Sequence, residues 1–424
     1  MLCLLWQPRS SLGAQRPVTR ADAIAAALSS GSRVALARAD TAAARARALT
    51  ARALPNPSLA ASYSKAVPQK HFTVEIPLEA PWMRGARIGA AEALSRAARL
   101  QFLSERAAAL VEVDTTYTSA LAAQARFQLS HQTAYDADSL RRMTVVRRDA
   151  GDASDLDVDL ATVVAGQQSN VASTDSLMYM SAVLTVQTLM GIPPDSQAIV
   201  LADSLRPSVP DTSLALGFPG VPGDFGVPVS PTPVGVARPA TTVPPLAVTP
   251  SIAAAEANVT AAELAIARER RSVLGFPAVS VGVEFGDPTG SEPGYLPLIG
   301  LVLPLPLFSR NQGPIAEATA ERDRARIQLV ATRLAVRQRL VEGLREREAL
   351  RARVTRDADL VTRAQRVATR SLTAYREGAS ALPAVLEAQR SAREVLGQYI
   401  DDLAALLIVN TELRALTQSA PSSP

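Results

Sequence analysis

The sequence has little of what enzymes of its length commonly use for chemistry. Among 424 residues there is one cysteine, Cys3, and there are two histidines. A disulfide within the chain and a cysteine-based metal site are therefore excluded. No nucleophile–base pair, phosphate-binding loop or cluster of metal-ligand residues is visible either. We therefore expect no enzyme activity, no cofactor and no metal site.

Lysines, aromatic residues and long apolar runs are also scarce. Only Lys65 and Lys70 among the 44 basic residues are lysines, and aromatics make up 4%. The arginines alternate with acidic residues, as in the segment 342–348, which is typical of a solvated helix face. Without a basic patch that also carries stacking aromatics, we expect no nucleic-acid partner. No run of about 18 uncharged apolar residues exists, so a membrane-spanning helix is not expected.

Residues 1–17 resemble an incomplete signal segment. The apolar run 2–6 is short, small residues precede Gln15, and the usual positive charge at the start is missing. We leave open that the true start lies upstream. No lipidation motif surrounds Cys3, so no lipid anchor is expected there.

The remaining composition favours long, closely packed helices, because the apolar share of 47% is carried mainly by Ala, Leu and Val. The chain is also duplicated, with a period of about 227 residues. Each copy contains a helix, a Pro-marked boundary, strands, a very long helix, a Gly turn and a shorter helix. We place the first repeat at 18–200 and the second at 251–417. A Pro-rich linker, 201–250, separates them, and a disordered tail, 418–424, follows.

Four segments are expected to be strands, two in each repeat. Apolar and polar residues alternate in 58–64, 72–79 and 280–286. Such alternation places one face of a strand in an apolar medium and the other in water. The fourth segment, 296–308, is apolar on both faces and contains Pro297, Pro304 and Pro306.

The helices are unusually long. Helices 20–53 and 251–273 precede the strands, and the segments from Gly85 to Gly151 and from Gly313 to Gly378 follow them, spanning 66 and 65 residues. A helix of 65 residues is about 100 Å long. Return helices are expected at 155–190 and 381–416.

Each long helix is predicted to end in a hairpin turn. Gly151 and Gly378 are expected to adopt the left-handed conformation that closes a helix. Ser154 and Ser380 follow them, and each is expected to cap the next helix.

These elements limit the possible assemblies. Membrane barrels need at least about eight strands, and sheet edges are not tolerated in lipid. If the strands enter a membrane, several copies must therefore share one barrel, and three copies with twelve strands are the simplest solution. The predicted fold is mainly α with a β-barrel part: a trimeric 12-stranded transmembrane β-barrel continued by duplicated helical hairpins that form a periplasmic tunnel.

In this order of motifs the sequence resembles the TolC-type outer membrane efflux proteins, in the branch that serves heavy-metal and cation efflux pumps. The resemblance covers about residues 18–417. It rests on Val18-Thr19 with Ala23-Ile24, and on three longer stretches: 54–59 (LPNPSL), 304–313 (PLPLFSRNQG) and 375–378 (YREG).

The resemblance implies the outer-membrane channel of a tripartite efflux system. Such a channel is a homotrimer in outer membrane lipid that extends into the periplasm. It passively exports substrates delivered by a periplasmic adaptor and an inner-membrane pump, here expected to be of the RND type. The transported substrate is not readable from the sequence.

The resemblance also implies site residues. In this family the two turns form the periplasmic tip that docks the adaptor, which here comprises Gly151, Asp152, Ala153, Ser154, Gly378, Ala379 and Ser380. Acidic rings close the family's pore just beyond the second turn. Glu387 matches one such position, whereas Ala384 departs from the other. Asp157 lies at the corresponding place in the first repeat, so Asp157 and Glu387 are the candidate gate.

Several of these features have simpler interpretations. Ser154 and Asp157 form an S-x-x-D pattern, so Asp157 is also expected to cap a helix, and both roles can hold together. Glu387 could equally be a solvated surface residue. Met178, Met180 and Met190 are interpreted as helix core rather than as metal ligands. Trp82 and Phe308 are each expected to end a strand run, and their aromatic rings are interpreted either as anchors at a membrane interface or as ordinary packing residues.

The competing function is that of a soluble periplasmic coiled-coil scaffold or adaptor. Such a protein would account for the helices. It would not account for amphipathic strands at the same place in both repeats.

Overall fold

The computed structural model describes residues 16–66, 68–196, 198–206, 249–273, 275–286 and 294–417. The proposed signal segment through Gln15, nearly all of the Pro-rich linker, Val67 and the tail lie outside these ranges. The chain divides into two compact units, and each is described by itself. The first contains the chain up to Ser32, the segment beginning at Ala109 and the segment beginning at Gln338; the second contains Arg33–Ala108 and Val248–Arg337. Within the described residues, no helix is long and apolar enough to cross a membrane.

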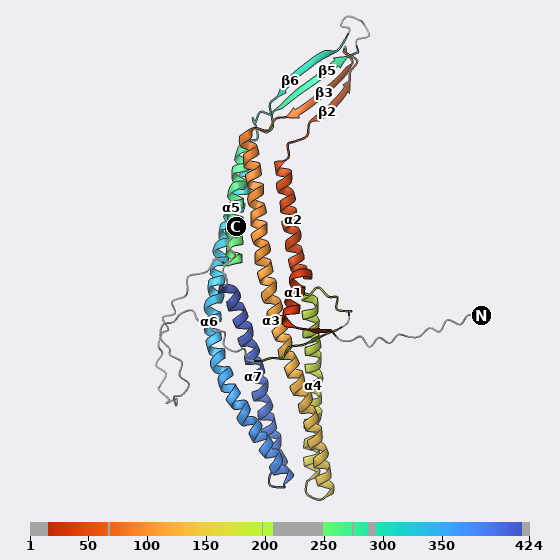
Figure 1. Ribbon diagram of the computed structural model, residues 1–424, viewed down its shortest axis with the longest axis vertical. Helices are drawn as coiled ribbons and strands as arrows, with labels where there is room; N and C mark the ends of the chain where they lie inside the picture. The colour runs from red at the N-terminus through yellow and green to blue at the C-terminus, as the bar shows by residue number, and fades with distance from the viewer. Residues whose placement is uncertain are drawn as a thin grey trace, which may run out of the picture. The chain divides into compact units, whose positions relative to one another are not determined.

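The second unit carries a four-stranded antiparallel sheet with the order β2-β3-β5-β6 (Figure 1). Its strands are β2 (Ser58–Tyr63), β3 (Lys70–Pro77), β5 (Ala278–Phe285) and β6 (Leu296–Val302). All four predicted strands are confirmed, and the central pair joins the first repeat to the second. The strand β6 is shorter than predicted. The run Leu303–Phe308 lies outside it, because Pro304 and Pro306 have no N–H to donate to a ladder.

The two faces of this sheet differ in polarity, as the alternation predicts. Leu59, Val74, Val281 and Ile299 lie side by side across the four strands, and Leu59 and Ile299 are 70% and 79% exposed. Glu75 and Ser280 are opposite each other on the other face. There the Nδ1 atom of His71 also lies 3.0 Å from a carboxylate oxygen of Glu284. One face is therefore apolar and exposed among the described residues, whereas the other is polar on β2, β3 and β5 and apolar on β6, where Leu298 pairs with Gly282.

The predicted helix 20–53 is wrong in one respect, because it is two helices: α1 (Arg20–Ser30) and α2 (Ser32–Arg52). Gly31 leaves the helical conformation, with ψ at 137°. A Cβ on Gly31 would lie 2.3 Å from the Ala27 carbonyl oxygen and 3.1 Å from that of Leu189. A residue with a side chain would therefore not fit at this break.

The long helices are confirmed. They are α3 (Pro81–Asp149) and α6 (Gln312–Arg376), of 69 and 65 residues, with the return helices α4 (Asp155–Leu189) and α7 (Leu382–Thr417). Helix α5 (Pro250–Arg271) precedes β5.

The placement of Trp82 at a strand end is wrong. Pro81 begins α3, where a missing N–H costs nothing, so Trp82 lies in the first helical turn. Phe308 lies outside β6 and is 97% exposed.

A small parallel sheet that was not predicted lies in the first unit. Strand β1 (Arg16–Val18) pairs with β4 (Ile199–Leu201), one residue past the proposed repeat boundary at 200. Tyr117 of α3 is fully buried beneath it, and its hydroxyl donates to the Val18 carbonyl oxygen and to Asp203, each at 2.9 Å. The beginning and end of the first repeat are thereby fastened to the middle of α3.

Candidate functional site

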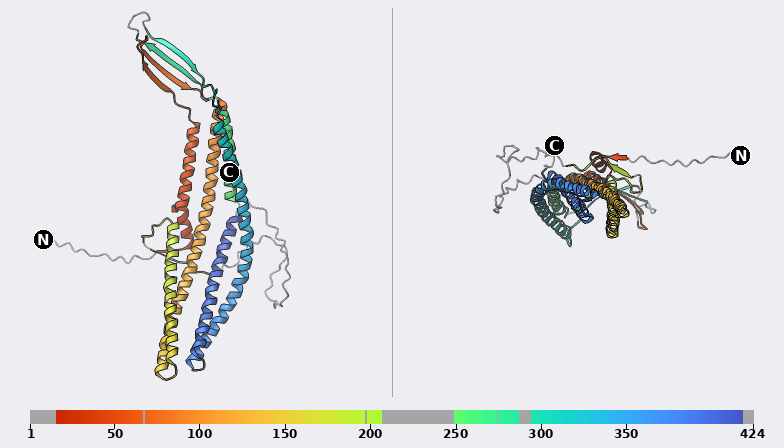
Figure 2. Two further views of the ribbon diagram at one scale, coloured as in Figure 1. Left: turned by 180° about the vertical axis from the view of Figure 1, so that it is seen from behind. Right: turned by 90° about the horizontal axis from the view of Figure 1, so that it is seen from below.

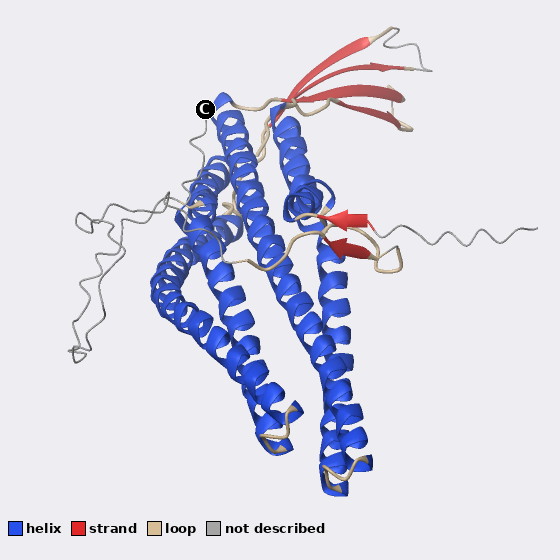
Figure 3. Ribbon diagram, turned by 60° about the horizontal axis from the view of Figure 1, so that its bottom comes forward, coloured by secondary structure: helices blue, strands red, loops and turns tan. Residues whose placement is uncertain are grey.

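Both predicted hairpin turns exist and have the same backbone geometry (Figure 3). Gly151 and Gly378 have φ values of +87° and +78°. The N–H of Asp152 donates to the Arg147 carbonyl oxygen, and the N–H of Ala379 donates to that of Ala374, each at 2.8 Å. These are equivalent bonds of a Schellman motif, which requires a left-handed residue that glycine supplies at least cost. The duplicated turns therefore agree in geometry.

The caps that follow the turns differ. Ser154 caps α4: its Oγ accepts from the Asp157 N–H at 3.1 Å, and an Asp157 oxygen accepts from the Ser154 N–H at 3.0 Å. The capping role predicted for Asp157 is thus confirmed. The capping role predicted for Ser380 is wrong, because α7 begins at Leu382 and the residue before it is Ala381. The Ser380 hydroxyl donates instead to the Ala381 carbonyl oxygen at 3.5 Å.

The two turns are joined through Tyr375, which is 4% exposed. The Arg147 guanidinium lies over its ring, 4.6 Å from the centroid, and donates to its carbonyl oxygen. The Tyr375 hydroxyl also lies 3.2 Å from the Thr144 hydroxyl. Leu140 and Val385 pack in the same buried cluster, so α3 and α4 meet α6 and α7 at their ends. The residues of the two turns therefore stand on a packed support.

The structure does not bring the candidate gate residues into contact. Among the described residues, no hydrogen bond or ion pair joins Asp157 to Glu387. Asp157 is half-buried in the capping box, and Glu387 is exposed on the second turn of α7. Each carboxylate would need copies of itself from other chains to form a ring.

A pair of facing carboxyl groups was missed by sequence reasoning. Asp402 of α7 is 4% exposed, and one of its oxygens lies 2.8 Å from the Arg353 guanidinium. Its other oxygen, and one oxygen of Asp357, are buried without a hydrogen-bond donor. Burial, and then the neighbouring Asp402, raise the pKa of the Asp357 carboxyl above its ordinary value near 3.8. Asp357 lies within a charged stretch and Asp402 follows Asp401, so sequence reasoning did not pair them.

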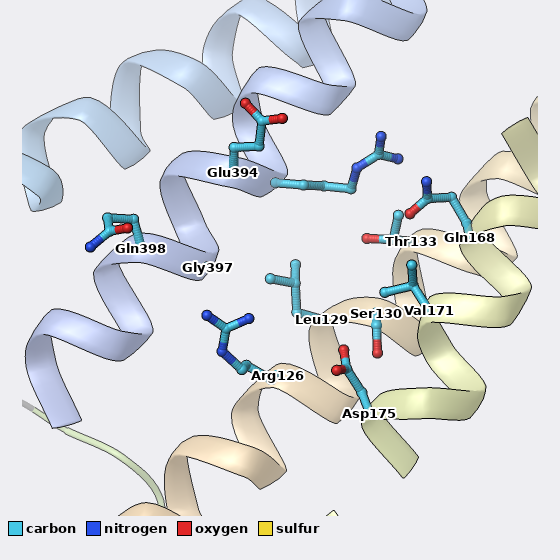
Figure 4. Close-up of a pocket in the computed structure, with 11 residues that line it drawn as sticks. Arg126, Leu129, Ser130, Thr133, Gln168, Val171, Asp175, Glu394, Gly397 and Gln398 are labelled. Atoms are coloured by element: carbon cyan, nitrogen blue, oxygen red, sulfur yellow. The ribbon is translucent and has the colours of Figure 1, made fainter. Parts of the chain in front are cut away.

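A groove of about 370 Å³ with polar and apolar lining lies over α3 between α4 and α7 (Figure 4). Arg126 and Thr133 line it from α3, Gln168 and Asp175 from α4, and Glu394 from α7. Arg126 is paired with Asp401 at 2.7 Å. The lining is mixed in charge and shared by three helices, so it has the character of a helix seam rather than of a catalytic pocket.

The methionines are only partly where they were predicted. Met190 is 5% exposed and belongs to the core, but Met178 and Met180 are each 58% exposed, so their assignment to the core is wrong. The described residues contain no group of three or more His, Cys, Asp or Glu side chains that could hold a metal ion.

Comparison with known proteins adds the remaining evidence. Residues 246–418, which hold the second repeat, match the family "Outer membrane efflux protein". The chain is 24% identical over 361 residues to the cobalt-zinc-cadmium resistance protein CzcC of Cupriavidus metallidurans, covering 83% of this chain and 78% of that protein.

Solved structures show the same fold. The outer membrane protein VceC from Vibrio cholerae superposes with a TM-score of 0.69 at 16% identity, over 94% of this chain and 96% of that one. The Campylobacter jejuni CmeC outer membrane channel gives a TM-score of 0.72 at 13% identity, over 94% and 85%. The second repeat therefore matches the outer membrane efflux protein family, and the chain as a whole has the fold of these outer membrane channels.

Proposed function

We propose that three copies of this outer-membrane efflux channel form one conduit, with a shared barrel in the outer membrane and a helical tunnel in the periplasm. The observation that carries the proposal is the sheet. Strands β2 and β6 are its outer strands, and each has one edge that is unpaired among the described residues. In hydrocarbon an unsatisfied backbone group costs several kcal/mol, so these edges must pair with other copies. Three copies of four strands give a closed barrel of twelve.

The polarity of the sheet agrees with this arrangement. The apolar face that contains Leu59, Val74 and Ile299 would contact lipid. The polar face, with Glu75, His71 and Glu284, would line the water-filled interior. Helices of about 100 Å would then continue the duct into the periplasm.

We further propose that the tip recruits a periplasmic adaptor, which couples the channel to an inner-membrane pump of the RND type. The tip comprises Gly151, Asp152, Ala153, Ser154, Gly378, Ala379 and Ser380. Its two turns share one backbone geometry, so they offer an adaptor two similar docking points in each chain. Asp157 and Glu387 are proposed to form a gate of repeated carboxylates in the trimer, in addition to the capping role of Asp157.

Divalent metal cations are the proposed substrate class. The support is the likeness to a cobalt-zinc-cadmium resistance protein. Deleting the gene should then increase sensitivity to cobalt, zinc and cadmium. If sensitivity to dyes and antibiotics rises while metal tolerance stays unchanged, the substrate class is wrong and the channel function still stands.

Membrane fractionation tests the channel against the soluble scaffold. The protein should sediment with outer membranes, remain there through washes with high salt and alkali, and require detergent for extraction. Release from the periplasm as a salt-soluble protein would contradict the channel and favour the scaffold.

A further inference from the structure

The apolar face of the four-stranded sheet contains a single charged side chain among the described residues, that of Lys70. The residues that share this face with it in the paired strands are all uncharged, from Leu59 on β2 to Leu301 on β6. Strand β3 begins at Lys70 and runs toward α3, whereas β5 runs away from α5. Lys70 therefore lies at the outer end of the sheet, the end that is far from both helices (Figure 1, Figure 2).

Aromatic rings surround this lysine. Lys70 is directly opposite Tyr63 on one neighbouring strand and Phe285 on the other. Its Nζ atom lies 5.6 Å from the centroid of the Phe285 ring, and Phe72 and Tyr295 pack against the same ring at 5.7 and 5.2 Å. Tyr63 and Tyr295 are 66% and 75% exposed. Rings with polar tips beside a cation are typical of the boundary between lipid and water.

The direction of the Lys70 side chain agrees with this boundary. Its stem passes Gly286, the first residue after β5, where a Cβ would lie 3.7 Å from the Lys70 Cγ. The side chain thus extends toward the outer end and away from the apolar rows below it. Long basic side chains at the edge of a membrane place their charge in the same way, with the stem on apolar surface and the head at the interface.

The charge of Lys70 has no acidic partner in the described part of the chain. The nearest acid in the ladder, Glu284, is on the other face and pairs with His71 at 3.0 Å. Lysine occurs only twice in the sequence, and both copies, Lys65 and Lys70, are exposed at the outer end. A charge next to lipid is costly unless it is hydrated or paired, so this position favours an anion.

We propose that Lys70, between Tyr63 and Tyr295, binds the phosphate of an anionic lipid headgroup in the outer leaflet of the outer membrane. The inference rests on the proposed channel, which puts the helices in the periplasm and the outer end of the sheet at the external side. A phosphate has several acceptor oxygens, so it can accept hydrogen bonds from the ammonium and from a tyrosine hydroxyl together.

The occupant is a lipid rather than a free anion because the site continues into the apolar face. Phe72 and Val74 follow Lys70 on that face and are both exposed. They would contact the acyl chains of the lipid whose headgroup Lys70 holds. Free phosphate would gain only the charge interaction with an exposed lysine, which is weak in water.

Binding to the full-length trimer in detergent tests the site. The probe is lipid A, a glycolipid with two phosphate groups, and native mass spectrometry counts the molecules bound. One lipid per chain is expected. Lys70→Ala should weaken binding roughly tenfold, since a charge-assisted hydrogen bond is lost, and Lys70→Arg should retain it. Dephosphorylated lipid A should bind the natural chain as weakly as lipid A binds Lys70→Ala.

Lys65→Ala is the matched control. It removes the other lysine at the same end, in the turn after β2 and outside the ladder, and should change the affinity by less than about twofold. Equal losses in the two alanine variants would mean that the lipid responds to general positive charge, and would overturn the site. Displacement of lipid A by inorganic phosphate alone would overturn a lipid as the occupant.

The test separates this site from the channel itself. A trimer that does not bind lipid A, or that binds the dephosphorylated form equally well, would overturn the Lys70 site and leave the channel intact. Protein that is monomeric and stable without detergent would instead contradict the proposed function.

Discussion

At the scale of single residues, the two turns differ in their caps, and this difference is testable. Ser154→Ala removes an N-cap hydroxyl that accepts from the Asp157 N–H at 3.1 Å. Such losses cost about 1 kcal/mol. Amide exchange in the first turn of α4 should therefore quicken roughly fivefold. Ser380→Ala is the matched control and should leave the first turn of α7 unchanged, since Ser380 does not cap it. Equal effects at both turns would contradict the assignment.

The carboxyl pair predicts a dependence of stability on pH. The folded-state pKa of Asp357 is raised, chiefly by burial, so protonating this group favours the folded state. The stabilisation of the folded state that comes from the protonated Asp357 carboxyl is complete below about pH 3.8. It is lost as the pH rises through the raised pKa. The variant Asp357→Asn stays neutral and should lose less stability between pH 4 and 8.

Thermal unfolding in detergent measures this difference. The Tm of Asp357→Asn should exceed that of the natural chain by about 1–3 °C at pH 8, and the gap should shrink toward pH 4. Asp359→Asn, at an exposed position two residues away, should show no such trend. A constant gap at all pH values would mean that Asp357 and Asp402 do not interact as described.

At the scale of elements, efflux should be most sensitive to the size of the side chains in the two hairpin turns. Gly151→Trp and Gly378→Trp should abolish efflux while trimers still reach the outer membrane, because the tip would no longer fit its adaptor. Both positions have positive φ, so about 1 kcal/mol of local strain is also expected. Export assays together with outer-membrane fractionation give both readouts.

Two further variants distinguish the effect of side-chain size from the effect of backbone strain. Gly151→Ala introduces the backbone strain at positive φ without the indole ring of tryptophan. It should retain most efflux, since a Cβ there meets nothing within 4 Å. Gly313→Trp places the same bulk on an exposed helical glycine far along the chain from either turn, and it should export normally. If the tryptophan variants at both turns transport normally, the docking tip is misplaced.

Much of the element order could be predicted because periodic patterns are local. The long helices follow from the absence of proline between Gly85 and Gly151, and the strands follow from their alternation. The break at Gly31 was not predicted, since a single glycine within an otherwise helical pattern does not by itself end a helix. The pairing of β1 with β4 joins two three-residue segments, too short to show any period. The Asp357–Asp402 pair depends on which helix faces meet.

At the scale of the whole molecule, the duplication explains how the chain builds its sheet. Strands of the two repeats pair at the centre, and each repeat supplies one outer strand. The compact units do not follow the repeats, because α3 and α6 each pass through both units. The family match covers the second repeat alone, whereas the fold comparison covers nearly all of the chain.

A gate of repeated carboxylates would be a property of the assembly. Like charges drawn together by symmetry attract cations, so conductance in planar bilayers should be small, cation-selective and blocked by trivalent cations. The double variant Asp157→Asn with Glu387→Gln should weaken selectivity and block together. Unchanged selectivity would mean that neither residue forms a gate: Asp157 would only cap α4, and Glu387 would be a solvated surface residue.

The measurement that tests the account most directly is the mass of the purified protein in detergent. Each chain has a mass of 44.7 kDa, and light scattering corrected for bound detergent should find a particle of three chains. The proposed barrel needs further copies because the outer strands of the sheet have no partner among the described residues, and three copies of four strands are the simplest closure. A monodisperse particle that holds a single chain, folded and stable without detergent, would contradict the shared barrel and with it the channel.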